Sequence, residues 1–123
     1  MSSENTFDVD CADPEVVRQT LVGQAEHVGA LLRRAGKQGR VAHLKLRWSD
    51  FTTITRQLAL PQASSADRTL VRAAATLFER EQVRRPVRLV GCGMSGLDDS
   101  GDGPRWLFQE FTEARDQQLD AAA

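Results

Sequence analysis

Three side chains that can donate hydrogen bonds to an anion, His43, Lys45 and Arg47, occur at every second position of one segment. Apolar residues occupy the positions between them, from Ala42 to Trp48. This alternation is typical of a strand that buries one face, and it places the three donors together on the other face. Lysine and arginine at this spacing suit the phosphate oxygens of a polyanion.

A second segment repeats the spacing with neutral side chains, Thr53, Thr55 and Gln57. The run from Phe51 to Leu60 is rich in threonine and branched residues, and it follows the first segment after a tight connection. We expect it to return as the antiparallel partner of the first strand and to end at Pro61. The open face would then carry cations beside hydroxyl donors.

Patterns that would indicate catalysis are not convincing. Residues 91–96 have the GxGxxG spacing of a dinucleotide site, but that site needs a helix to follow, and acidic and small residues follow instead. We interpret these glycines as strand positions that leave one face without side chains. His27 and His43, the only histidines, form no triad or metal set, and no carboxylate pair is placed to hold magnesium. We predict that this chain alone is not an enzyme and holds no metal or cofactor.

Length and composition indicate one ordinary domain. The chain has 123 residues, of which 41% are hydrophobic and 27% charged, so it can bury a core without disulfides or zinc. Cys11 and Cys92 lie far apart in the sequence and are predicted to be ordinary thiols in a reducing compartment. No apolar run approaches the length of a membrane helix, and the first ten residues are polar. We expect a cytoplasmic location and no membrane partner.

Charge is unevenly distributed, although the formal net charge is -1. Residues 33–88 hold thirteen basic and four acidic side chains, a net charge of +9. Residues 1–32 hold one basic and six acidic side chains, and residues 89–123 hold two and seven, so each end has a net charge of -5. A basic centre between acidic ends indicates a polyanionic partner.

Two helices are predicted to support the strands. Asp13-Pro14-Glu15 is a strong start signal for the first helix, which we expect to end at Gly36, before a turn at residues 37–39. Ser64 and Asp67 have the spacing of a capping box for the second helix, which we expect to end at residues 84–86.

The remaining elements complete the fold. Val87–Met94 is predicted to be the last and central strand, and Phe7–Val9 a short additional strand. The order is β-α-β-β-α-β, which predicts an α+β fold with a four-stranded, mainly antiparallel sheet and two helices on one face. We expect one domain over residues 1–97, and a linker from Asp98 to Gly103 that begins an acidic tail over residues 98–123.

Two segments carry a family resemblance, VAHLKLRWSDFTTITR at residues 41–56 and PVRLVGCGMSGL at residues 86–97. They resemble the little finger domain of Y-family DNA polymerases of the bacterial DNA polymerase IV type, over roughly residues 6 to 97. The resemblance implies a non-catalytic domain tethered to a polymerase core, with its sheet in the major groove of primer–template DNA. The catalytic parts and their magnesium are expected only in that core, which this chain lacks.

The resemblance also implies site residues, because the family touches backbone phosphates from these strands. The residues predicted to bind DNA are His43, Lys45, Arg47, Thr53, Thr55, Arg56, Gln57, Arg88 and Ser95. Arg56 conflicts with strict alternation, which places it beside Ile54 and Leu58, so we expect either a bulge or a position beyond the helices. Gln57 and Gly93 depart from the small hydroxyl and basic residues that are frequent in the family, which implies fewer phosphate contacts.

The resemblance adds partners. Family members often end in a sliding-clamp peptide of the form Gln-Leu-x-Leu-Phe. Trp106, Leu107 and Phe108 preserve its apolar end, and residues 118–120 preserve its beginning. The alternative for this tail is a helix that packs on a neighbouring surface. The implied partners are primer–template DNA, the polymerase core and the sliding clamp.

The open face and the charge distribution predict a domain that binds the duplex backbone without sequence specificity, and the resemblance implies that it does so during translesion synthesis and DNA repair by an error-prone polymerase. The alternative is a small regulatory or oligomerisation module that pairs through the same sheet face, which requires apolar side chains there. An RNA-binding domain of similar layout would present aromatic residues for base stacking, and the sequence contains no tyrosine.

Overall fold

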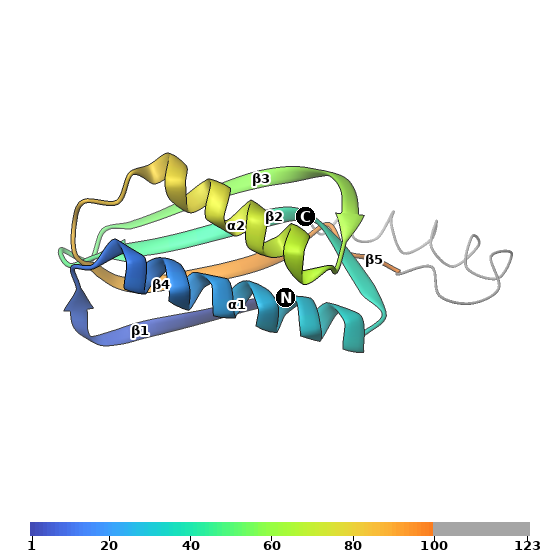
Figure 1. The fold of residues 1–123 in the computed structure, drawn as a ribbon, viewed down its shortest axis with the longest axis horizontal. Helices are drawn as coiled ribbons and strands as arrows, with labels where there is room; N and C mark the ends of the chain where they lie inside the picture. Colours follow the sequence, from blue (N-terminus) through green and yellow to red (C-terminus); the bar gives the residue numbers. More distant parts are fainter. Residues whose placement is uncertain (100–123) are drawn as a thin grey trace, which may run out of the picture.

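The computed structural model describes residues 1–99, which form a sheet with two helices (Figure 1). The elements are β1 (Ser2–Cys11), α1 (Pro14–Arg34), β2 (Lys37–Trp48), β3 (Thr53–Ser64), α2 (Asp67–Glu81), β4 (Val87–Ser95) and β5 (Asp98–Asp99). The strand order is β1-β4-β2-β3, every neighbouring pair is antiparallel, and β5 pairs with the start of β2. The predicted α+β fold and the central place of β4 are confirmed.

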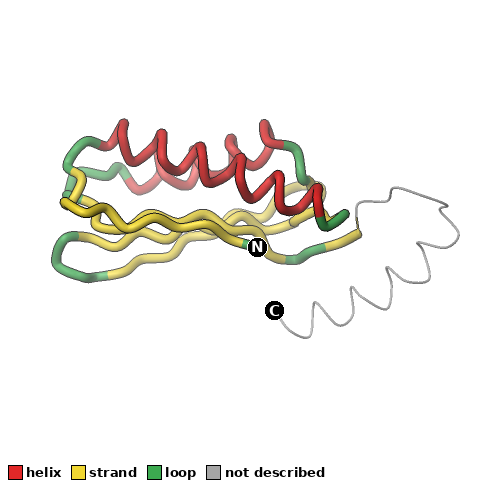
Figure 2. The backbone as a smooth tube through the Cα atoms, turned by 90° about the horizontal axis from the view of Figure 1, so that it is seen from below, coloured by secondary structure: helices red, strands yellow, loops and turns green. Residues whose placement is uncertain are grey.

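The helices form one layer and the sheet forms the other (Figure 2). The core lies between them, because α1 and α2 bury their apolar stripes against the inner face of β2 and β4. The alternate residues of β2 that face the helices are 0–6% exposed: Ala42, Leu44, Leu46 and Trp48. Within residues 1–99, no helix covers the opposite face of the sheet, and none is long and apolar enough to cross a bilayer.

Local sequence signals account for the start and end of α1. The Asp13 carboxylate accepts a hydrogen bond from the backbone N–H of Glu15 at 3.0 Å, and Pro14 occupies the first helical position. The helix ends at Arg34, and Gly36 then adopts a φ of +66°, a conformation that glycine adopts without a steric penalty.

Several predicted strand boundaries are wrong, because pairing with a distant strand extends the element. β1 begins at Ser2 rather than Phe7, since residues 2–6 pair with β4. β2 begins at Lys37, where a turn was expected, because Lys37 and Gln38 pair with Asp99 and Asp98. Asp98 and Asp99 therefore form a strand, not the start of a linker. The division into residues 1–97 and 98–123 stays a prediction.

Strand β3 also runs past its expected end, since it continues through Pro61 to Ser64. β3 is the edge strand, and its register with β2 shifts between the Val41–Ala59 and Gly39–Ser64 pairs. Proline is tolerated at an edge or an irregularity of this kind because its missing N–H breaks no ladder bond.

The expected ends of α2 are wrong too. No side chain caps its first turn: the Ser64 hydroxyl accepts from the backbone N–H of Ala66 at 3.1 Å, and the Asp67 carboxylate pairs instead with Arg33 of α1 at 2.7 Å. The helix ends at Glu81, before the predicted residues 84–86, because Gln82 adopts a left-handed conformation with φ of +48°.

The buried thiol of Cys92 leads to a testable expectation. Cys92 lies in the core at 4% exposure, and burial raises its pKa to about 11. At pH 8 only about a thousandth of this thiol would be the reactive thiolate. We expect iodoacetamide to modify the less buried Cys11 first and Cys92 only after denaturation, as read by mass spectrometry of peptides. Equal modification rates in the folded protein would contradict this account.

Candidate functional site

The register of the sheet brings the predicted donors together on the face opposite the helices. His43 lies opposite Gln57, Lys45 opposite Thr55, and Arg47 opposite Thr53. Residues directly opposite each other in antiparallel strands point to the same side of the sheet. Ser95 of β4 joins them, since it lies opposite Val41, the next open-face position of β2. The structure therefore places seven of the nine predicted residues on one surface, which we call the open face: His43, Lys45, Arg47, Thr53, Thr55, Gln57 and Ser95.

Two hydrogen bonds hold side chains of the open face in place. The Nε of Arg47 donates to Oγ1 of Thr53 at 2.9 Å, and the guanidinium has further N–H donors that this bond does not use. A ring nitrogen of His43 lies 2.6 Å from Oγ of Ser95 across the β2–β4 pair. Fixing these donors in advance lowers the entropy cost of binding an anion.

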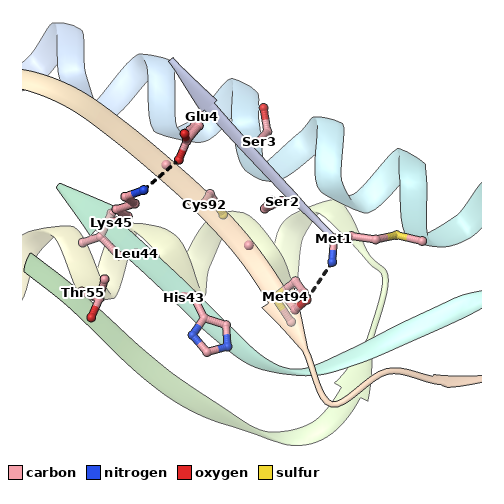
Figure 3. Close-up of a pocket in the computed structure, with 12 residues that line it drawn as sticks. Met1, Ser2, Ser3, Glu4, His43, Leu44, Lys45, Thr55, Cys92 and Met94 are labelled. Carbon is pink, nitrogen blue, oxygen red and sulfur yellow. Dashed lines mark hydrogen bonds and ion pairs between the residues drawn. The ribbon is translucent and has the colours of Figure 1, made fainter. Parts of the chain in front are cut away.

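A hollow of about 380 Å³ interrupts this surface (Figure 3). The hollow runs along β4, where Gly91 lies opposite Lys45 and Gly93 lies opposite His43. A Cβ atom added at Gly91 would approach Cβ of Glu4 to 3.0 Å, and one at Gly93 would approach the backbone oxygen of Met1 to 3.2 Å. The interpretation as strand positions without a side chain on one face is confirmed for Gly91 and Gly93, but it is wrong for Gly96, which follows the end of β4 and adopts a φ of +63°.

The open face also contains Glu4 and Leu89, two residues that were not predicted from the sequence. Glu4 lies opposite Gly91 on β1, and its Oε2 is 3.4 Å from Nζ of Lys45. Leu89 lies opposite both Arg47 and Thr6, and it is only 5% exposed although it is outside the helix-side core. Alternation over residues 2–7 would have placed Glu4 on the same face as Ser2 and Thr6. It was not used because β1 was predicted to begin only at Phe7.

Arg56 lies away from the open face. It is opposite Leu44 on the helix side, and pairing without a register shift from Val41 to Arg47 excludes the bulge alternative there. Its Nε is 2.6 Å from the carboxylate of Glu81 at the end of α2, so the side chain emerges at the margin of the helix layer. The ion pair with Glu81 compensates the positive charge of Arg56, which the alternation of β3 directs toward the core.

Arg88 also lies outside the open face. The register of β4 shifts there, because Leu89 pairs with Arg47 and Val87 with Trp48. The guanidinium stacks over the exposed ring of Phe51 at 4.3 Å from the ring centroid and lies 3.5 Å from the carboxylate of Asp10. This position is near the β2–β3 turn, at the end of the sheet that also carries Arg47.

His43 makes stability depend on pH. Partial burial lowers the pKa of its ring from 6.5, and the positive amino group of Met1 lowers it further. The unfolded chain therefore binds this proton more readily than the folded chain. We expect the free energy of unfolding to fall as pH drops from 7 through 6.5, and His43→Gln to make this dependence shallower. Urea denaturation at pH 7.0 and 5.5 tests it, and an unchanged dependence in the variant would contradict the assignment.

Within residues 1–99, no three His, Cys, Asp or Glu side chains are grouped so that they could hold a metal. The predicted clamp-binding residues Trp106, Leu107 and Phe108, and residues 118–120, lie outside the described part of the chain.

Sequence comparisons place the chain in a family. A family model described as the impB/mucB/samB family C-terminal domain matches residues 1–105. DNA polymerase IV of Dehalococcoides mccartyi strain CBDB1 is 36% identical over 125 residues, which cover 99% of this chain and 31% of the relative. DNA polymerase IV of Alkalilimnicola ehrlichii is 38% identical over 97 residues, which cover 79% of this chain and 27% of the relative. The chain therefore spans about a third of the length of these curated relatives.

Solved structures share the fold. The little finger domain of PolIV, solved in complex with a beta-clamp processivity factor, matches with a TM-score of 0.56 at 19% identity, over 74% of this chain and 82% of the other. Dbh DNA polymerase, solved as a post-insertion binary complex, matches with a TM-score of 0.59 at 15% identity, over 74% of this chain and 26% of the other. The solved structures show that the chain shares the fold of the little finger domain of PolIV, and the family match over residues 1–105 shows that this chain, which is similar to DNA polymerase IV, belongs to the impB/mucB/samB C-terminal domain family.

Proposed function

We propose that this domain binds the sugar–phosphate backbone of primer–template DNA through the open face, without sequence specificity. The observation that carries the proposal is the placement of Lys45 and Arg47 on the sheet face opposite the helices, beside the hydroxyls of Thr53 and Thr55. Charged and hydroxyl donors of this kind bind phosphate oxygens. Within residues 1–99, the open face presents strands and no helix that could read base edges in a groove. We therefore infer that binding does not depend on DNA sequence.

The role in the whole protein rests on the family. We infer that the domain is a non-catalytic part of an error-prone polymerase and helps it to hold the template during translesion synthesis and DNA repair. The polymerase core is then its partner and supplies the catalytic acids and magnesium. A relative's little finger domain was solved with a beta-clamp, so the sliding clamp is a further proposed partner. The cytoplasmic location stays a prediction.

The test is fluorescence anisotropy of a labelled primer–template duplex, titrated with this chain across a salt series. If four to six phosphates are neutralised, the logarithm of affinity should fall with the logarithm of salt at a slope of about -4 to -5. Two duplexes of unrelated sequence should bind alike. Absence of binding even near 20 mM salt, together with a dimer in sedimentation, would replace this proposal by the oligomerisation module.

A further inference from the structure

The open face contains a carboxylate that a phosphate-binding surface does not need. Glu4 lies on it because residues 2–6 of β1 pair with β4, and its Oε2 is 3.4 Å from Nζ of Lys45 (Figure 3). The two residues come from strands that are not neighbours, since β4 lies between β1 and β2. The Glu4 carboxylate pairs with the Lys45 ammonium group, which the proposed function assigns to a phosphate. It also adds a negative charge where phosphates would approach.

Gly91 makes this contact possible. It lies opposite Glu4 on one side and opposite Lys45 on the other, so no side chain separates them. Even a methyl group at this position would lie 3.4 Å from Oε2 of Glu4 and 3.0 Å from its Cβ. The lysine therefore reaches across β4 at a position that carries no side chain on this face.

The ion pair is poorly suited to a purely structural role. The side chains of Glu4 and Lys45 are 53% and 39% exposed, and exposed pairs of this kind contribute little to stability. Their charges still act on a third charge that approaches within a few ångströms, because screening by salt extends over about 8–10 Å.

We propose that Glu4 competes with DNA phosphates for Lys45 and thereby limits the affinity of the domain for the duplex. This inference rests on the proposed function. A phosphate that approaches Lys45 must displace the carboxylate and then stay close to it, so each encounter is weakened. The consequence is faster release, which suits a domain that must move along the duplex as synthesis advances.

The experiment measures affinity for the labelled primer–template duplex at 50 mM salt with the whole chain and four variants. They are Glu4→Gln, Lys45→Ala, the double variant, and Glu79→Gln as the matched control. Glu79 pairs with Arg18 at 3.7 Å on the helix layer and is 66% exposed, so its replacement removes the same charge away from the open face. Thermal unfolding of each variant confirms that the fold is retained.

We expect Glu4→Gln to bind about 3- to 10-fold more tightly, and Glu79→Gln to stay within about 2-fold of the wild type. In the Lys45→Ala background the gain from Glu4→Gln should shrink to under about 2-fold. Unchanged or weaker binding by Glu4→Gln, or a gain that persists without Lys45, would overturn the inference. If the wild type does not bind the duplex at all, the proposed function itself fails.

Discussion

Replacing Lys45 and Arg47 together by alanine should weaken binding to a primer–template duplex about 30-fold at low salt, on the basis of roughly 1 kcal/mol for each lost phosphate contact. The slope of log affinity against log salt should become shallower by about 1.8, because two fewer phosphates are neutralised. Both side chains lie on the open face, and Thr53 holds Arg47 at 2.9 Å. Arg47→Ala alone should cost more than Lys45→Ala alone, since Lys45 is shared with Glu4. Anisotropy across a salt series measures all three effects.

The matched control removes two positive charges from the other side of the molecule. Arg72 and Arg80 are exposed on α2, in the helix layer. The Arg72→Ala/Arg80→Ala variant has the same net charge as the open-face variant, so it separates local contacts from general attraction to a polyanion. Equal losses of affinity in the two double variants would show that the open face is not the binding surface.

Leu44→Ala should lower the free energy of unfolding by about 2–5 kcal/mol, because it leaves a cavity in the centre of the core. Leu44 is 1% exposed on β2, and its strand lies inside the sheet between β4 and β3. The loss is large compared with the stability of an ordinary domain of this size. Urea denaturation followed by circular dichroism gives the free energy directly.

Val41→Ala is the comparison on the same strand. Val41 lies three residues away on the opposite face, where its cross-strand neighbours are Ala59 and Ser95. No helix covers this side within residues 1–99, so we expect a loss below about 1 kcal/mol. A loss as large as that of Leu44→Ala would mean that the open face is packed against something in the folded state.

Local patterns in the sequence were sufficient to predict which side chains of β2 and β3 lie on the open face. The alternation from Ala42 to Trp48 sets which side chains of β2 are buried, because successive residues of a strand point to opposite faces. The same rule applied to Thr53, Thr55 and Gln57, and the register of β2 with β3 confirms their placement. Asp13 and Gly36 marked the ends of α1 because capping depends on residues that are neighbours in sequence.

Boundaries that depend on distant partners could not be predicted in this way. β1 and β5 are polar segments with weak local preference for a strand, and they become strands because β4 and β2 offer unpaired backbone groups. The Asp67 carboxylate was expected to cap α2, but Arg33 of another helix lies within 2.7 Å of it. Arg56 stays at the margin of the helix layer because it forms an ion pair with the Glu81 carboxylate there.

The side of the sheet on which Lys45 and Arg47 lie could be predicted from alternation within a few residues, the fold class from the order of the elements, and the family from the resemblance of residues 41–56 and 86–97. The groups that those cations contact could not be predicted and became evident only in the folded sheet. Glu4 precedes Lys45 by 41 residues, and the two charges come together only because β4 lies between their strands with Gly91 at the crossing. A contact of this kind arises from strand order and register, which a one-dimensional pattern does not contain.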